Sequence, residues 1–172
     1  MRGQQRTIRN EHVADEKHPT SQSELLIKLQ MESNPEALCL VRAAIQRATE
    51  TLHFQESDSR AIVLSVDEAI TNVIRHAYKG QPGLLIEVTC RRLRREKNGA
   101  KRGGIEILLQ DSGVPVNPAK LKGRALEEIR PGGLGLHFIR QSMDEVEFTR
   151  VQGKNQLRLV KYLPAARANK GE

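Results

Sequence analysis

The stretch SVDEAITNVIRHAY, residues 65–78, decides how this chain of 172 residues is interpreted. Ile70 lies on an apolar stripe at helical spacing, which predicts an amphipathic helix over about 59–78. Glu68 and Asn72 are four residues apart, so they are neighbours on that helix, away from the stripe. A polar pair there is typical of a solvated face, but it also suits a general base beside a Mg²⁺-binding amide oxygen. This stretch leaves both interpretations open.

A second candidate site lies in LLQDSGVPV, residues 108–116, where a predicted strand ends. Asp, Ser, Gly and Pro all favour turns, so an ordinary strand end explains the pattern. The chemical interpretation makes Asp111 an acceptor for an exocyclic amine, because an ionised carboxylate bonds strongly to such a donor. Gly113 would then let a flat ring come close. Both interpretations fit this stretch.

The third candidate site is RPGGLGLHFIRQ, residues 130–141, where glycines directly precede a helix predicted over Leu134–Met143. Glycine can simply make a tight turn. A glycine turn that opens a helix also provides backbone N–H donors for a phosphate. The segment is neither the dinucleotide-binding GxGxxG pattern in a βαβ unit nor a GxxxxGK[ST] phosphate loop.

The remaining pattern predicts helices first and then mostly antiparallel strands, which favours an α+β two-layer sandwich. Asn34 and Pro35 start a helix that runs to about Phe54, and Ser57 or Asp58 caps the helix at 59. We expect strands at 24–30, 84–93, 104–112, 145–151 and 156–163, with the last two joined by the turn QGKN.

Composition limits the class of protein. With 38% hydrophobic residues, 3% aromatic residues and no Trp, the core should be aliphatic. No apolar run approaches the roughly 20 residues that span a bilayer, and the first residues lack a secretory signal. Cys39 and Cys90 form no CxxC motif or disulfide framework. We therefore expect a reduced, cytoplasmic protein without a membrane partner.

The positive charge is local. The formal net charge is +7, and residues 91–102 hold seven Lys or Arg against one Glu, which is +6. This basic hairpin has no interleaved aromatic residues and matches no nucleic-acid-binding motif. A solvated hairpin or a docking surface for an acidic partner is therefore favoured over nucleic-acid binding.

The three motifs occur in the order ExxxN, DxGxP and a glycine turn that opens a helix. In this order the chain resembles the histidine-kinase-like ATPases with the Bergerat ATP-binding fold. VDEAITNVIRHAY and GGLGLHFIRQSMDEVEF look most like the anti-sigma factor serine/threonine kinases. The resemblance implies a mixed, mostly antiparallel sheet with helices packed on one face.

The resemblance also implies domain boundaries. Residues 1–22 would be a flexible N-terminal arm and 23–163 the ATPase domain. Within that domain, 117–132 matches the ATP lid, and 164–172 is a polar tail.

The resemblance further implies roles for single residues, with ATP and Mg²⁺ as cofactors. Glu68 matches the general base, Asn72 the Mg²⁺ ligand, and Asp111 with Gly113 the adenine site. Asn155 matches a position close to the phosphates where the family often has Thr or Ser. The glycines and backbone N–H donors at the triphosphate match Gly133, Leu134, Gly135 and Leu136.

The implied function is that of an ATP-dependent serine/threonine kinase that is also an anti-sigma factor. Its expected partners are a STAS-type anti-anti-sigma factor as substrate, a competing sigma factor, and a second copy in a homodimer. The alternative is an ATP-binding partner-switching module without productive transfer, for which the altered residue Asn155 is the sequence support.

Overall fold

The structure is a computed structural model that describes residues 22–97, 100–115 and 134–164. Its five strands form one sheet in the order β1-β2-β3-β5-β4, and all four pairings are antiparallel. The α+β two-layer fold is confirmed, but the sheet is antiparallel throughout these residues rather than mixed. The strands are β1 Gln22–Glu32, β2 Leu85–Lys97, β3 Ala100–Asp111, β4 Glu145–Val151 and β5 Lys154–Tyr162.

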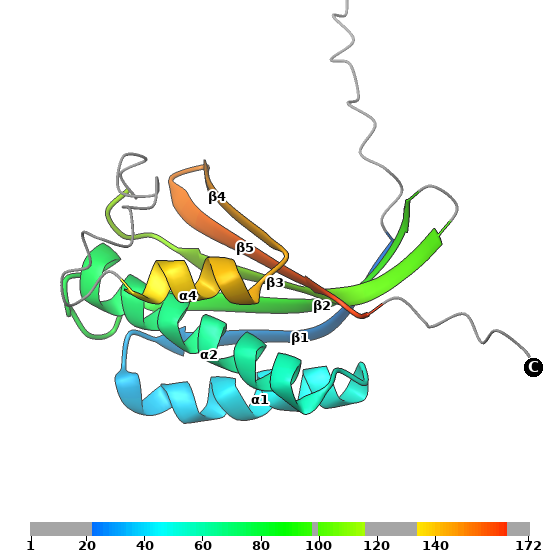
Figure 1. The fold of residues 1–172 in the computed structure, drawn as a ribbon. Coiled ribbons are helices and arrows are strands. Elements are labelled where there is room, and N and C mark those ends of the chain that lie inside the picture. The colour runs from blue at the N-terminus through cyan, green and yellow to red at the C-terminus, as the bar shows by residue number, and fades with distance from the viewer. Residues whose placement is uncertain (1–21, 98–99, 116–133, 165–172) are drawn as a thin grey trace, which may run out of the picture.

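The helices lie over one face of the sheet, as predicted (Figure 1). The first begins at Pro35 as predicted, because Asn34 Oδ1 accepts a hydrogen bond from the Glu36 amide at 3.0 Å. The helical elements are η1 Pro35–Ala37, α1 Leu38–Thr51, α2 Glu56–Asn72, η2 Val73–Ala77 and α4 Leu134–Ser142. The expected arm, lid and tail lie mostly or wholly outside the described residues.

The start of α2 differs from the prediction. The helix begins at Glu56, and neither Ser57 nor Asp58 caps it. Asp58 instead lies 3.9 Å from the Lys161 ammonium of β5. The buried Ser59 hydroxyl pairs with that of Thr49 in α1. These side chains are used for packing between elements, while acidic residues in the first turn still suit the helix dipole.

The end of α2 also differs. A continuous helix was expected to residue 78, but after Asn72 the chain widens into the π-helix η2. The Tyr78 amide reaches the Val73 carbonyl at 2.9 Å, five residues back. Gly80, at φ 77°, then donates to the Ile74 carbonyl at 2.8 Å and closes the turn. Such π segments often occur at functional sites.

The core is aliphatic, as the composition predicts. Along β3, Ile105, Ile107 and Leu109 are buried and face the helices. Because strand side chains alternate between faces, Asp111 continues this row and also lies on the helix side. The opposite face is polar, with Arg158 joined to Glu106 at 2.6 Å. The sheet therefore delivers a carboxylate to the end of its apolar face.

The closing hairpin turns on two residues, not on the predicted four. Gln152 and Gly153 have φ values of 50° and 80°, which suits the tight turns that match strand twist. Lys154 and Asn155, expected in the turn, therefore belong to β5. Asn155 is consequently a fixed member of the sheet.

The basic hairpin was predicted correctly as a hairpin. β2 and β3 stay paired as far as Lys97 and Ala100, and the hairpin that they form runs past the helices (Figure 1). Arg92 reaches Glu24 of β1 at 3.1 Å.

No helix among the described residues is long and apolar enough to cross a membrane.

We expect native protein to expose one reactive thiol. Cys39 is exposed, whereas Cys90 is fully buried and burial raises its thiol pKa from 9.0 to about 12. A thiol reagent at pH 8 should modify one cysteine in the native chain and both in denaturant. Between pH 9.0 and about 12 the Cys90 thiol loses its proton in the unfolded chain but keeps it in the folded chain. The free energy of unfolding therefore falls as the pH rises through this range. Modification of Cys90 in a Cys39→Ser variant without unfolding would contradict this burial.

Candidate functional site

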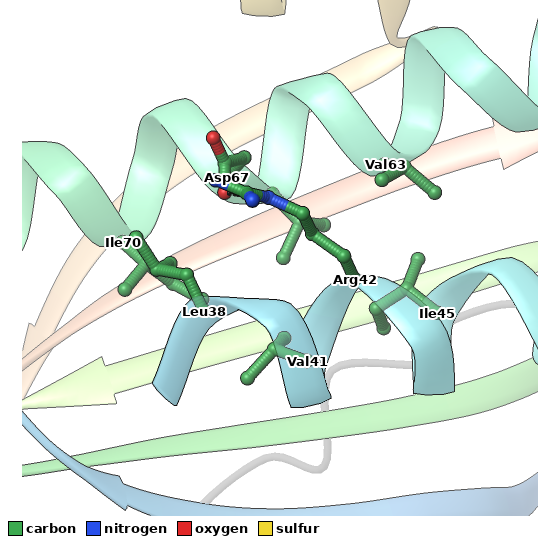
Figure 2. Close-up of a pocket in the computed structure, with 8 residues that line it drawn as sticks. Leu38, Val41, Arg42, Ile45, Val63, Asp67 and Ile70 are labelled. Carbon is green, nitrogen blue, oxygen red and sulfur yellow. Dashed lines mark hydrogen bonds and ion pairs between the residues drawn. The ribbon is translucent and has the colours of Figure 1, made fainter. Parts of the chain in front are cut away.

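The α1–α2 seam sets the rotation of the helix that carries Glu68. Arg42 of α1 reaches from the apolar seam to Asp67 of α2, and its Nε lies 2.7 Å from Asp67 Oδ1 (Figure 2). The ion pair with Asp67 raises the pKa of the Arg42 guanidinium. Each residue advances about 100° around a helix. With Asp67 turned to α1, Glu68 therefore points to a different neighbour.

That neighbour is α4. A methyl group at Gly135 would come within 1.8 Å of Glu68 Oε1. The candidate base and the helix opened by glycines, separated by 67 residues in the chain, are thus in contact. Leu134 and Leu136 contribute their backbone to the first turns of α4. Gly133 lies outside the described residues.

Glu68 and Asn72 are both half-buried, one turn apart on α2. Neither side chain makes a hydrogen bond or ion pair with another described residue. Within that part of the chain, no three His, Cys, Asp or Glu residues converge to hold a metal. The pair therefore offers one carboxylate and one amide oxygen without competing partners.

Asp111 is buried, with 7% of its surface exposed. Its Oδ1 accepts hydrogen bonds from the Gly113 amide and from Asn155 Nδ2, both at 2.8 Å. Its Oδ2 has no hydrogen-bond partner among the described residues. Every fully buried side-chain oxygen in that part of the chain does have a partner, so Oδ2 must keep some accessible surface. Oδ2 is therefore the accessible oxygen, free to accept from a ligand.

Asn155 was expected close to the phosphates, but the β3–β5 register groups it with Asp111. The two residues are direct cross-strand partners. Residues opposite each other on antiparallel strands lie on the same face. The placement of Asn155 in the turn was therefore wrong, whereas its expected position close to the phosphates stays a prediction.

The Asp111 loop touches the end of η2. The Val114 amide donates to the Ala77 carbonyl at 3.0 Å. A methyl group at Gly113 would lie 2.6 Å from that same oxygen. Only glycine fits where the chain at residue 113 comes this close to Ala77. From Ala77, η2 leads directly back to Asn72. The first two sequence motifs thus meet in space.

The motif analysis missed two residues of this site. Tyr78 donates its hydroxyl hydrogen to the Leu85 carbonyl and accepts from the Ser112 amide at 3.1 Å. Burial is the main cause of its raised pKa. Arg150 donates to Asn155 Oδ1. Tyr78 ends the quoted RHAY segment and could have been considered, whereas Arg150 is found only once the hairpin register is known.

An open hollow of about 810 Å³ adjoins the Asp111 loop. Tyr78, Ser112 and Gly113 contribute to its wall, together with residues from the start of β2. Glu68, Asn72 and Asp111 do not line it. The hollow therefore borders the candidate site without containing its carboxylates.

A family model described as histidine kinase-like ATPase domain matches residues 31–161. This chain belongs to that family. Among curated proteins, it is 25% identical to the serine-protein kinase RsbW of Bacillus mycoides over 145 residues, covering 80% of this chain and 84% of the relative. The serine-protein kinase RsbW of Bacillus pumilus is 27% identical over 130 residues, covering 71% and 76%.

Among solved structures, a structure of a Mycobacterium tuberculosis protein matches with a TM-score of 0.48 and 16% identity. The structure is described as the RsbU and RsbW domains of Rv1364c. The match covers 81% of this chain and about a third, 34%, of the other.

The residues present fit the ATP and Mg²⁺ of a histidine kinase-like ATPase. Asp111 Oδ2 is open to a donor such as an exocyclic amine. Gly113 packs against the Ala77 backbone, where a Cβ would clash, and its amide holds Asp111 Oδ1. Mg²⁺ takes few protein ligands in addition to phosphate oxygens, so one Asn oxygen beside one carboxylate suits it.

The two glycines should respond differently to replacement by alanine. In Gly113→Ala the new methyl group meets the Ala77 backbone, which cannot move aside, so a loss of about 1–3 kcal/mol is expected. In Gly135→Ala it meets the end of the flexible Glu68 side chain. That variant should keep its stability, because alanine favours the helix by up to about 1 kcal/mol.

Thermal unfolding of the two variants measures this difference. A large fall in Tm for Gly135→Ala would show that Glu68 has no alternative position. No fall for Gly113→Ala would show that the contact with Ala77 is loose.

Proposed function

We propose that this chain is an ATP-dependent serine/threonine protein kinase whose general base is Glu68. The observation that carries the proposal is the contact between the Glu68 carboxylate and the first turn of α4 at Gly135. Phosphate groups are favoured at helix N-termini, so the base lies where the transferred phosphoryl group would be held. The names of the RsbW relatives support the same activity.

Each residue then has one task. Asp111 binds the adenine of ATP through Oδ2, and Gly113 belongs to the same adenine site, where its amide holds Asp111 Oδ1. Asn72 would hold Mg²⁺, which neutralises charge on the phosphates when bound. Glu68 accepts the proton of a partner's Ser or Thr hydroxyl as that oxygen attacks the γ-phosphorus, and the bond from phosphorus to the β–γ bridging oxygen breaks to release ADP. Gly133, Leu134, Gly135 and Leu136 provide the phosphate-binding turn.

The proposed substrate is a STAS-type anti-anti-sigma protein, and the proposed second partner is a sigma factor. In this scheme the unphosphorylated substrate competes with the sigma factor for the kinase, which acts as a homodimer in the cytoplasm. These partner classes come from the resemblance to the anti-sigma factor kinases. Within the described residues, no feature favours nucleic acid over protein as the partner.

Replacement of Glu68 by Gln should lower phosphotransfer by about 10²- to 10⁴-fold, because the amide cannot accept the proton. The assay follows labelled γ-phosphate from ATP·Mg²⁺ to each small anti-anti-sigma candidate of the same genome. ATP binding should survive in the variant. Glu56→Gln is the matched control, since Glu56 lies on the same helix with its side chain 81% exposed.

Full transfer by Glu68→Gln would refute the assignment of the base. A stable complex with a candidate but no labelled product from the wild-type chain would instead identify a partner-switching module that binds ATP without transfer.

A further inference from the structure

Three polar side chains form a row across the edge half of the sheet. Arg150 on β4 is the cross-strand partner of Asn155 on β5. Asn155 is in turn the partner of Asp111 on β3. Their positions are set by the ladder and by the two-residue turn at 152–153, which brings Arg150 opposite Asn155. The row therefore connects an exposed cation to the buried carboxylate.

The Asn155 carboxamide lies between them with both ends engaged. Its oxygen accepts from Arg150 Nη1. Its nitrogen donates to Asp111 Oδ1 at 2.8 Å and to the Val114 carbonyl at 3.2 Å. Arg150 Nη1 also lies 3.4 Å from the Gly113 carbonyl. Every polar atom of the carboxamide thus points to a fixed partner.

We propose that Arg150 is a positioning residue that makes the site selective for purines carrying a 6-amino group. Its guanidinium fixes the carboxamide with the oxygen outward and the nitrogen toward Asp111. Asp111 Oδ1 is then saturated by Gly113 and Asn155, and the carboxylate plane is fixed. Oδ2 remains as the acceptor that meets the ligand.

The chemistry explains why the orientation matters. If the carboxamide turned over, its oxygen would face the carboxylate and its nitrogen would face the guanidinium, so both contacts would become repulsive. The ionised Asp111 carboxylate makes a strong hydrogen bond to the N–H of a 6-amino group. A purine with oxygen or only hydrogen at position 6 leaves Oδ2 unpaired. Discrimination therefore depends on holding Oδ2 in place.

This inference rests on the proposed ATP binding and adds the residue that sets its selectivity. The test is calorimetric binding of ATP, inosine triphosphate and purine riboside triphosphate, with Mg²⁺, to the full chain. Purine riboside triphosphate lacks the 6-amino group and inosine triphosphate has oxygen there. The wild-type chain should bind ATP at least about tenfold more tightly than either.

In Arg150→Met we expect about five- to tenfold weaker ATP binding, with the other two nucleotides changed by less than about twofold. The selectivity ratio, which is the dissociation constant of either other nucleotide divided by that of ATP, should therefore fall. Arg150→Lys keeps the charge and should retain part of the ratio. Lys154→Met is the matched control: it removes a cation beside Asn155 that pairs with Glu87 at 2.7 Å instead.

The ratio separates positioning from simple support of the hairpin. If Arg150→Met leaves the selectivity ratio unchanged, for example by weakening the binding of all three nucleotides equally, the inference is overturned and the kinase proposal stays intact. Absence of ATP binding by the wild-type chain would overturn both. Thermal unfolding of each variant identifies any change that comes from lost stability.

Discussion

The buried carboxylate of Asp111 is the constraint on which the rest of the site depends. A carboxylate with 7% exposure must be hydrogen-bonded, because burial of an unpaired charge is very costly. Its partners come from two segments, the loop at Gly113 and strand β5 at Asn155. The loop is joined in turn to η2 through Val114 and Ala77. Satisfying one charge therefore ties together three parts of the chain that are distant in sequence.

The two ends of the site are held in different ways. At the Asp111 end, position is set by backbone: the ladder, the π-helix and the close contact at Gly113. At the Glu68 end, position is set by side-chain packing against Gly135. Backbone contacts resist change, whereas a Glu side chain has several rotamers of similar energy. The Asp111 end of the candidate site is thus the rigid part, and the Glu68 end can adjust.

Much of this arrangement could be predicted from the sequence. Helical spacing identified α1 and α2 because a helix period is a local property, and the strands followed from alternation and turn residues. The motif order led to the right family. Glu68 and Gly135 were both selected, since each belongs to a short pattern with its own chemistry.

What could not be predicted depends on pairing between distant strands. A two-residue difference in one turn moved Asn155 from a loop into the ladder and gave it Asp111 as a neighbour. Arg150 has no motif of its own and acquires its role only from that register. The widening after Asn72 also lacks a local signal, because it arises where η2 must meet Gly113. The start of α2 was predicted wrongly for the same reason, because Asp58, one of the two expected caps, lies beside Lys161 of β5 instead.

The position of Asn155 shows how a residue can change its chemistry while the fold is kept. A hydroxyl side chain at that position would donate one hydrogen and reach less far. The carboxamide is longer and has two opposite ends, so its use here requires a second partner for the oxygen. Arg150 is that partner, and the observed register brings it from the next strand. Asn155 and the cation on β4 thus form one unit that orients Asp111.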